Sequence, residues 1–451
     1  MRLIIIGGVA AGTSAASKAR RNNEKAEIVL YEQGPDISYA GCDTPYFIGG
    51  LIKDIKTLTP RSVGFFKNKY NVDVKIRHQV QAIDLKTRSL SIQDLETDRT
   101  FTDHYDKLII ATGAKAVIPD IPGVGQEHVF SLRTIQDTLK IDSFIKKNKP
   151  QTAAIIGSGS IGMEMAENLS RIGLDVHVIE MAPQINPALD PDMSVHLEKH
   201  LNEHGVKTYR STQAAKIEAS YLLTADGEKI PGDIVIMATG IRPEVSLARD
   251  AGIKLGATGA IAVDEHMQTS DPDVYACGDC IEHFDLIRQK AAWFPLASTA
   301  NKTGRICGDA VTGGSLTFRG VLGTGIFRVF GLSVARTGLG EDQAREAGYD
   351  IAVVHITGPD RSASVGGRDI IIKAIADRKT EKLLGAQLIG EDGIDKRIDV
   401  LVTAMTLGAK ISDLFQLDLA YSPFHATVKD PVHYVGMVLD KAISKDRLSR
   451  K

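Results

Sequence analysis

The sequence predicts an α/β fold with two parallel-sheet, nucleotide-binding domains and a smaller C-terminal α+β domain. Two observations predict the nucleotide-binding part: a glycine-rich turn follows an apolar run within residues 3–12, and another does so within residues 153–162. Such runs are typical of strands buried on both faces of a parallel sheet. The third observation is a change of pattern after residue 320, where two apolar strands precede an amphipathic helix.

Length and composition are those of a soluble globular protein with several domains. The chain has 451 residues, of which 43% are hydrophobic and 24% charged. A net charge of −2 gives no support for a nucleic-acid partner or a basic membrane-binding surface. No apolar run approaches the ~18 residues of a membrane span, and the N-terminal run is too short for a signal peptide. Four cysteines are too few for a disulfide framework, so a cytoplasmic location is expected.

The first glycine turn has the layout of a dinucleotide-binding, Rossmann-like βαβ unit. The strand Leu3–Ile6 enters the turn Gly7–Gly12, and a helix is expected over 13–22. The next strand ends at Glu32, where an acid suits the hydroxyl groups of a ribose. Val9 replaces the middle glycine of the G-x-G-x-x-G pattern, so a coincidental glycine-rich turn stays open as the alternative.

The second glycine turn fits the same pattern in full. Gly157-Ser158-Gly159-Ser160-Ile161-Gly162 follows the strand Ala153–Ile156 and precedes a helix expected over 163–171. The strand Asp175–Ile179 then ends at Glu180. Two such units imply two dinucleotides, with one working site and one decayed duplicate as the alternative. Because the acid at Glu180 repels a 2′-phosphate, NADH is expected to be preferred over NADPH.

Cys277 and Cys280 share the Cys-x-x-Cys spacing of several kinds of site. No second pair and no His-x-x-x-His run accompanies them, so a zinc site is not expected, and no other metal site is expected. The favoured interpretation is two small buried residues beside a cofactor, and a redox pair is the alternative.

Three further segments extend the two units to a family resemblance. Leu108–Gly113 and Val235–Gly240 each join an apolar strand to Ala-Thr-Gly, and Thr269–Asp279 ends in Gly-Asp. With the two glycine turns in this order, the chain resembles the pyridine-nucleotide disulfide oxidoreductases over essentially its whole length. Members of that family are flavoproteins that bind two dinucleotides.

The resemblance implies which cofactor each unit binds. Residues 1–118 and 257–319 would bind FAD, and the inserted residues 119–256 would bind NADH, with NADPH as an alternative. Asp279 would bond the ribityl chain of the flavin, and a helix starting near Ala297 would stabilise negative charge on its pyrimidine edge. The implied FAD contacts are Gly7, Gly8, Ala11, Gly12, Glu32, Ala111, Thr112, Gly113, Asp279 and Ala297. The implied pyridine-nucleotide contacts are Gly157, Gly159, Ile161, Gly162, Glu180 and Gly240.

The C-terminal region, residues 320–451, resembles the dimerisation domain of the family. Strands are expected at Ile370–Ala376 and Leu383–Ile389, and a helix at Lys396–Leu407. The resemblance implies a homodimer in which the segment Tyr421–Pro431 reaches the active site of the partner chain.

Cys42 lies in the run Ile37–Tyr46 and has no second cysteine at the Cys-x-x-x-x-Cys spacing. This arrangement resembles the one-cysteine branch of the family: coenzyme A disulfide reductases, persulfide reductases, NADH oxidases and NADH peroxidases. The resemblance implies a sulfur that cycles between thiolate and a mixed disulfide or sulfenic acid. That chemistry requires an exposed sulfur of low pKa. A structural free cysteine is the alternative.

Residues near the first glycine turn bear on the substrate. Oxidases and peroxidases of this branch carry a histidine where this chain has Ala10, which weakens the case for peroxide chemistry. Ala10, Arg20, Arg21 and Ser38 are the implied contacts of a coenzyme A-type substrate, since arginine pairs well with phosphate. An ordinary solvated helix face is the alternative for the two arginines.

Several positions depart from the branch. Gly41 replaces the usual asparagine before the cysteine, and Asp43-Thr44 replaces the usual apolar pair after it. A carboxylate at that place disfavours the thiolate. The run Thr357–Asp360 lacks one tyrosine of the coenzyme A disulfide reductases, whereas Tyr421 matches the other.

His425 and Asp430 resemble the histidine–acid dyad of the two-cysteine reductases. The hypothesis is that His425 of one subunit serves as acid–base for Cys42 of the other, with Asp430 orienting the imidazole. A packing or substrate-contacting histidine is the alternative.

The expected function is that of a FAD-dependent NAD(P)H oxidoreductase that reduces a small disulfide or persulfide, with coenzyme A derivatives as first candidates. Two alternatives stay open: an NADH oxidase that reduces oxygen, and a flavoprotein electron carrier that feeds another acceptor. The expected partners are a small-molecule thiol or disulfide and a second copy of the chain, without nucleic acid or membrane.

Overall fold

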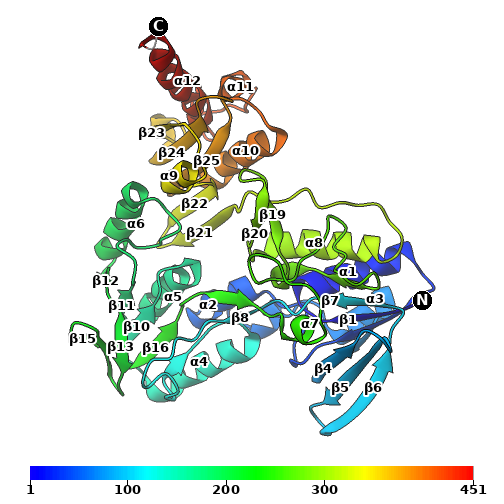
Figure 1. The fold of residues 1–451 in the computed structure, drawn as a ribbon. Helices are drawn as coiled ribbons and strands as arrows, with labels where there is room; N and C mark the ends of the chain where they lie inside the picture. The colour runs from blue at the N-terminus through cyan, green and yellow to red at the C-terminus, as the bar shows by residue number, and fades with distance from the viewer. Residues whose placement is uncertain (450–451) are drawn as a thin grey trace.

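The computed structural model describes residues 1–449 and builds them around three five-stranded sheets (Figure 1). The first sheet has the order β18-β7-β1-β2-β3, and all its neighbouring strands are parallel. Its strands are β1 (Arg2–Ile6), β2 (Glu27–Tyr31), β3 (Asp73–Lys75), β7 (Lys107–Ile110) and β18 (Val274–Ala276).

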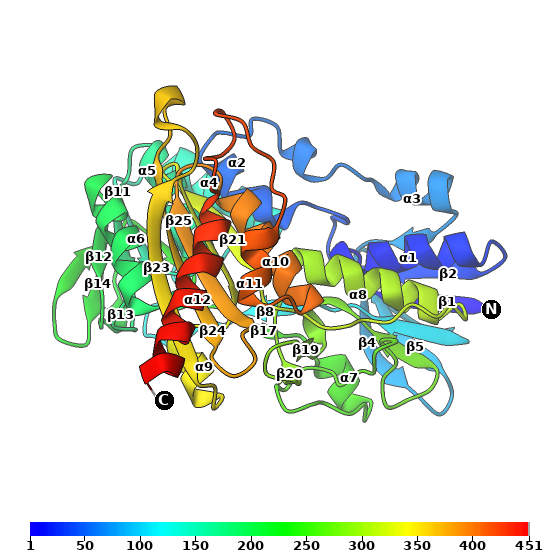
Figure 2. The ribbon, with the colours of Figure 1, turned by 90° about the horizontal axis from the view of Figure 1, so that it is seen from above.

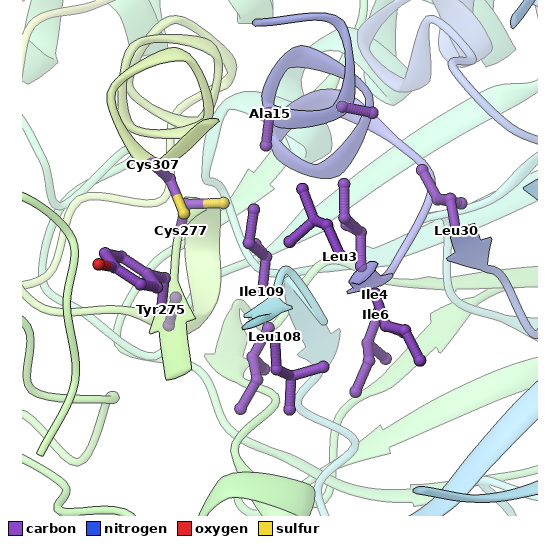
Figure 3. Packing of buried hydrophobic residues seen from close by; sticks show 14 of the residues in the cluster. Leu3, Ile4, Ile6, Ala15, Leu30, Leu108, Ile109, Tyr275, Cys277 and Cys307 are labelled. Atoms are coloured by element: carbon purple, nitrogen blue, oxygen red, sulfur yellow. The ribbon is translucent and has the colours of Figure 1, made fainter. Parts of the chain in front are cut away.

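The central strands of this sheet are buried on both faces, as their continuous apolar runs predict. Leu3, Ile4, Leu108 and Ile109 have no exposed surface. Figure 3 shows them under two helices that cover one face of the sheet, α1 (Ala10–Asn22) and α8 (Ala297–Ala310).

Helices α1 and α8 pack with their backbones nearly in contact. A Cβ atom on Gly304 would overlap the carbonyl of Ala11, and one on Gly308 would overlap that of Ala15. Glycine is therefore required at both positions of α8, because only a hydrogen atom fits there. The first unit is thus completed by β18 and α8, which come from much later in the chain than β1 and α1.

The second sheet has the order β12-β11-β10-β16-β9 and is also parallel. Its strands are β9 (Val129–Phe130), β10 (Thr152–Ile156), β11 (Asp175–Ile179), β12 (Lys207–Tyr209) and β16 (Ile234–Met237). Helices α4 (Ile135–Asn148), α5 (Ser160–Arg171) and α6 (Pro191–Glu203) share one apolar core with this sheet.

Smaller elements connect and flank the two parallel sheets. The antiparallel pair β8 (Ala114–Ala116) and β17 (Ile241–Pro243) carries the chain between them. The other small sheets are β4 (His78–Asp84), β5 (Ser89–Asp94) and β6 (Arg99–His104); β13 (Ala214–Ile217), β14 (Tyr221–Thr224) and β15 (Lys229–Pro231); and β19 (His283–Asp285) with β20 (Lys290–Ala292). The short helices are α2 (Thr44–Ile48), α3 (Val63–Tyr70), α7 (Ser246–Asp250) and α9 (Glu341–Glu346).

The third sheet is antiparallel, with the order β21-β22-β25-β24-β23. Its strands are β21 (Gly325–Val329), β22 (Leu332–Gly338), β23 (Ile351–Pro359), β24 (Asp369–Asp377) and β25 (Leu383–Gly390). Helices α10 (Ile394–Leu407), α11 (Ile411–Gln416) and α12 (Pro431–Ser449) follow, and Figure 2 shows α12 lying across this sheet.

The predicted strands agree with the structure to within one or two residues, but three predicted helices, those of α1, α5 and α10, begin two or three residues too late. Helix α1 starts at Ala10 and α5 at Ser160, because each glycine turn leads directly into the first helical turn. The predicted domain boundaries stay predictions; they fall after β8, between α7 and β18, and between α8 and β21. Residues 450 and 451 of the predicted C-terminal domain lie outside the described residues. Within residues 1–449, no helix has the length and apolar character needed to cross a membrane.

Candidate active site

The first glycine turn joins β1 to α1 in a tight, strained path. Gly7 has φ +104°, and a Cβ atom there would overlap the carbonyl of Ala111, which follows β7. Glu32, at the end of β2, accepts hydrogen bonds from the backbone N–H groups of Gly8 (2.8 Å) and Gly34 (2.7 Å). Burial raises the pKa of Glu32, and these N–H donors oppose the rise. Glu32, the acid predicted at this position, therefore links the glycine turn to the segment after β2 through its hydrogen bonds.

The second turn repeats this geometry around Glu180. Its carboxylate accepts from the backbone N–H of Ser158 (2.9 Å), from the Ser158 hydroxyl (2.6 Å) and from the N–H of Ala182 (2.9 Å). Gly157 has φ +103° and donates to the carbonyl of Ile179 at 2.8 Å, as Gly7 donates to that of Tyr31. In both turns, then, the first glycine donates to the last residue of the second strand, and the acid after that strand accepts from the next residue of the turn.

The two Ala-Thr-Gly segments lie where the chain passes between the two parallel sheets. The hydroxyl of Thr112 donates to the carbonyl of Glu244 (2.6 Å), and that of Thr239 donates to the carbonyl of Val117 (2.6 Å). Gly113 (φ +69°) and Gly240 (φ +94°) turn the chain directly afterwards. Each threonine therefore bonds the residue that follows a connecting strand, β17 for Thr112 and β8 for Thr239, a role that the sequence pattern does not show.

The helix starts around these turns fit dinucleotides. Helices α1, α5 and α8 begin after Val9, Gly159 and Leu296, and none of these described residues provides a side-chain cap. Their first N–H groups form a donor set suited to pyrophosphate at α1 and α5, and to negative charge on reduced flavin at α8. A Cβ atom on Gly159 would meet nothing within 4 Å, so the start of α5 is open. Ala11, Ile161 and Ala297 lie within these first turns.

Asp279 lies in the short turn Gly278–Cys280 after β18. Burial raises its pKa, and Arg133, whose guanidinium lies 3.9 Å from the carboxylate, opposes the rise. The indole N–H of Trp293 donates to the Asp279 carbonyl at 2.8 Å and fixes this turn.

Cys277 and Cys280 are fully buried, as the favoured interpretation expects, and both are free thiols. Figure 3 shows the Cys277 sulfur directed at Cys307 of α8. The hydrogen bond between these two thiols, together with burial, raises the pKa of Cys277 well above its usual range. Cys277 and Cys307 thus pack the end of β18 against α8.

Cys42 occupies the turn Gly41–Asp43, directly before α2, and is the one exposed thiol among the four cysteines, all of which lie in the described range. The expectation of a low pKa is wrong for this chain. Partial burial raises the pKa of Cys42, and the carboxylates of Glu164, Asp43 and Asp279 raise it further, whereas Arg133 opposes them.

Sequence reasoning missed Glu164, which contacts the Cys42 region from α5. Its carboxylate lies 3.4 Å from the hydroxyl of Tyr46 on α2. Burial raises the pKa of Glu164 to about 7, and it likewise raises that of Tyr46 to about 12. Glu164 follows Ser160 by four residues, so it lies on the same helix face as the open helix start. That spacing is the signal that could have identified it.

The predicted substrate residues near α1 occupy different surroundings. Arg20 is buried and donates to four backbone carbonyls, those of Tyr70 (2.7 Å), Asn71 (2.9 Å), Glu24 (2.5 Å) and Asn23 (3.3 Å). It therefore anchors α1 to the loop after α3, and both predicted interpretations, a phosphate contact and a solvated face, are corrected for this residue.

The remaining predicted substrate residues lie near the surface. Arg21 is exposed and rests on Tyr70, with its guanidinium 5.5 Å from the ring centre. Ala10 opens helix α1. Ser38 has φ +49° and donates its N–H to the Gly8 carbonyl at 2.8 Å, which ties it to the first glycine turn.

The segment 421–430 presents exposed aromatic and apolar side chains. Tyr421, Phe424 and Val428 are 54%, 69% and 74% exposed. The Nδ1 atom of His425 is hydrogen-bonded to the Ser422 hydroxyl at 3.0 Å. Within residues 1–449 of one chain, no hydrogen bond or ion pair joins this segment to the Cys42 turn.

Asp430 does not orient His425 in this structure, which corrects the predicted dyad. Its carboxylate instead bonds the guanidinium of Arg397 at 2.9 and 3.3 Å and the N–H of Val432 at 3.1 Å. The arginine comes from α10, a helix on which the sequence pattern showed only an apolar face.

Comparisons with known proteins agree with this architecture. A family model described as pyridine nucleotide-disulphide oxidoreductase matches residues 1–304, and the model of its dimerisation domain matches residues 326–431. The chain is 36% identical to an NADH oxidase of Methanocaldococcus jannaschii, over 96% of this chain and 97% of that protein. It is 34% identical to a CoA-dependent NAD(P)H sulfur oxidoreductase of Pyrococcus furiosus, over 97% and 99%. The solved structure of a NAD-dependent persulfide reductase from A. fulgidus superposes with a TM-score of 0.96 at 38% identity, over 99% of this chain and 84% of that one.

Proposed function

This chain belongs to the pyridine nucleotide-disulphide oxidoreductase family, and we propose that it is a FAD-dependent, NAD(P)H-driven reductase of a small disulfide or persulfide. FAD, when bound, supplies the two-electron transfer between pyridine nucleotide and sulfur. The observation that carries the proposal is Cys42, the single exposed thiol, which lies at the start of α2 within electrostatic reach of Asp279 and Glu164. Its sulfur is the nucleophile toward the substrate.

The residues around the two turns support the cofactor assignment. Glu32 and the start of α1 would hold the adenosine half of FAD, Asp279 its ribityl chain, and the start of α8 its pyrimidine edge. Glu180 and the start of α5 would hold the pyridine nucleotide. The carboxylate of Glu180 supports a preference for NADH, since it disfavours a 2′-phosphate.

A coenzyme A-type substrate is supported by the CoA-dependent sulfur oxidoreductase of Pyrococcus furiosus. Arg21, Ala10 and Ser38 are its proposed contacts, and the exposed guanidinium of Arg21 suits a phosphate. Arg20 is left out of this set because backbone carbonyls already engage its guanidinium.

We further propose that the enzyme is a homodimer in which Tyr421 and His425 of one chain complete the Cys42 site of the other. The exposed side chains of Tyr421, Phe424 and Val428 support an interface at this segment. Co-expressing Cys42→Ser and His425→Ala chains in equal amounts tests it, because each mixed dimer contains one intact pairing. Random mixing would then restore about a quarter of wild-type activity. A mixture no more active than the two separate variants would contradict the shared site.

The substitution Cys42→Ser tests the function itself. The variant should retain FAD and the reduction of ferricyanide by NADH, while losing turnover of CoA disulfide and CoA persulfide by at least about 100-fold. Retained disulfide turnover would support an electron carrier instead. Lys53→Ala, at an exposed position after α2 that belongs to no proposed contact set, is the control for general disturbance of this region.

An NADH oxidase is the second candidate, favoured by the relative in Methanocaldococcus jannaschii. Ala10, which stands where oxidases and peroxidases of the branch carry a histidine, argues against it. The oxygen electrode decides between them: the proposed reductase consumes little oxygen per NADH when a disulfide is present, whereas an oxidase consumes oxygen in proportion to NADH.

A further inference from the structure

Asp190 ends the nucleotide loop (residues 181–190) and occupies the N-cap of α6, but it does not cap this helix. An aspartate at an N-cap usually accepts a hydrogen bond from a backbone N–H group of the first helical turn. Within the described residues, the Asp190 side chain makes no such bond. Its carboxylate contacts the third sheet and α9 instead, and Figure 1 shows α6 next to the third sheet.

Three bonds tie Asp190 to residues 326–431, the segment that matches the dimerisation domain. The ammonium of Lys373 on β24 lies 2.9 Å from Asp190 Oδ2. The backbone N–H of Glu341, at the start of α9, donates to the same oxygen at 3.1 Å. The backbone N–H of Asp190 donates to the amide oxygen of Gln387 on β25 at 2.8 Å. Asp190 and Lys373 are only 9% and 2% exposed, so water competes little for these bonds.

Lys373 keeps its charge in this buried place because three carboxylates surround it. Those of Asp190, Asp192 and Glu341 each lie 2.9 Å from its ammonium. Burial lowers the pKa of Lys373, but the bonds to these carboxylates outweigh burial and raise the pKa above its ordinary value. Removing either Asp190 or Asp192 still leaves the lysine with two carboxylates, so neither change leaves its charge unpaired.

The nucleotide loop also bonds the acid of the second glycine turn. The backbone N–H of Asn186 donates to the Ser158 hydroxyl at 2.7 Å, and that hydroxyl donates to the Glu180 carboxylate at 2.6 Å. Ser158 and Asn186 are buried, so these bonds are shielded from water. The N–H of Leu189 donates to the Asn186 carbonyl at 3.0 Å, which closes the turn between Asn186 and Asp190. Bonds therefore lead from the dimerisation domain through Asp190 and the loop to Glu180.

We propose that Asp190 is a positioning residue for the pyridine nucleotide: it fastens the nucleotide loop to the dimerisation domain, and the loop in turn holds Ser158 so that Glu180 faces the ribose. The inference rests on the proposed contact between Glu180 and the nucleotide. It gives the dimerisation domain a second role, in the nucleotide affinity of its own chain. Without the Asp190 bonds the loop is free to move, and nucleotide binding must order it again, which lowers the affinity.

Titration calorimetry of the FAD-loaded enzyme with ADP-ribose tests this role. ADP-ribose has the adenosine ribose and the pyrophosphate but no nicotinamide. Its binding requires neither flavin reduction nor Cys42, so the result is independent of the Cys42→Ser test of the proposed function. Asp190→Ala should raise the Kd for ADP-ribose by about fivefold, and Gln387→Leu, which removes a neutral partner of the Asp190 backbone, by about threefold.

Asp192→Ala is the matched control, since it also removes one carboxylate from Lys373 but lies within α6, outside the nucleotide loop. Its other partner is the exposed imidazole of His355. Thermal unfolding should show a similar loss of stability in Asp190→Ala and Asp192→Ala. The Kd for ADP-ribose should change by less than about twofold in Asp192→Ala.

A double-mutant cycle separates the loop from general effects on the fold. Ser158→Ala breaks the bond between the loop and Glu180, so adding Asp190→Ala to it should raise the Kd little further. Fully additive effects of the two substitutions would overturn the proposal, as would an unchanged Kd in Asp190→Ala. Equal increases in Asp190→Ala and Asp192→Ala would overturn it as well, because the effect would then be that of lost stability.

Discussion

Arg397 and Asp430 form an ion pair with an Nη2–Oδ2 distance of 2.9 Å, and their side chains are only 1% and 2% exposed. The arginine also donates to the carbonyl oxygens of Gly393 and Asp360. The pair thus holds α10, the end of β23 and the start of α12 together.

Breaking this ion pair should destabilise the protein without changing the pH dependence of its activity. Asp430→Ala leaves the Arg397 charge buried without its partner, which typically costs about 3 to 5 kcal/mol. Chemical denaturation measures the loss, and Asp418→Ala, at an exposed aspartate, is the control. If Asp430 instead oriented His425, the pH profile of the remaining activity would shift; the structure predicts that it does not.

Alanine at two glycines of the second turn should separate an effect on stability from an effect on nucleotide binding. A Cβ atom on Gly162 would overlap the Gly157 carbonyl, so Gly162→Ala should lower stability by about 1 to 3 kcal/mol. Gly159→Ala meets no neighbour within 4 Å and should leave the unfolding midpoint unchanged. Because its methyl group enters the open space at the start of α5, it should raise the KM for NADH. Thermal unfolding and steady-state kinetics check the two outcomes.

One thiol of four should react rapidly in the native protein. Cys277, Cys280 and Cys307 have no exposed surface, whereas Cys42 is exposed. Titration with a small aromatic disulfide reagent should therefore give one fast equivalent, and the other three only after denaturation. Cys42→Ser should abolish the fast equivalent. Any fast equivalent that remains in this variant would show that a thiol buried between β18 and α8 is accessible.

Neutralising Glu180 should weaken the preference for NADH. Its carboxylate binds Ser158 and Ala182 and carries the charge that repels a 2′-phosphate. Glu180→Gln should lower the ratio of kcat/KM for NADH over NADPH by about tenfold, since removing one such repulsion is worth about 1.4 kcal/mol. The rate of ferricyanide reduction gives kcat/KM for each nucleotide. Glu203→Gln, at an exposed position of α6, is the control and should leave the ratio unchanged.

The raised pKa of Glu164 also predicts a pH-dependent stability. Its folded-state pKa is about 7 against an ordinary value of 4.5, so the folded state binds this proton more tightly than the unfolded state does. Stability therefore falls as the pH rises from 4.5 through 7, and Glu164→Gln lacks this loss. At pH 8 the variant should be more stable by about 1 to 2 kcal/mol, allowing for its partial exposure. The difference should vanish near pH 4.5, and a constant difference across this range would contradict it.

Short sequence patterns correctly predicted the buried strands and the residues that directly follow them. The strands containing Leu3–Ile6 and Ala153–Ile156 are continuous apolar runs, and both acids, Glu32 and Glu180, follow their strands as expected. The burial of Cys277 and Cys280 followed from the same reasoning.

The errors concern contacts between residues far apart in the chain. Arg20 bonds the Tyr70 carbonyl, Arg397 bonds Asp430, and Glu164 contacts Tyr46 across 118 positions of sequence. None of these pairings has a local signature, because each forms only when separate elements pack. The raised pKa of Cys42 has the same origin: only one of its three acidic neighbours, Asp43, is adjacent in sequence.

The late arrival of β18 and α8 has a consequence for synthesis on the ribosome. All strands of the second sheet lie between residues 129 and 237, so its chain is complete while the first sheet still lacks its edge strand. The first sheet waits for Val274–Ala276, and α1 stays without its covering helix until residue 310 has emerged. Because domains fold as their sequence becomes available, the nucleotide unit that starts second finishes first. Until then, the four strands already made leave β7, with Leu108, at an uncovered edge, and this edge is the part of the nascent chain most exposed to misassociation.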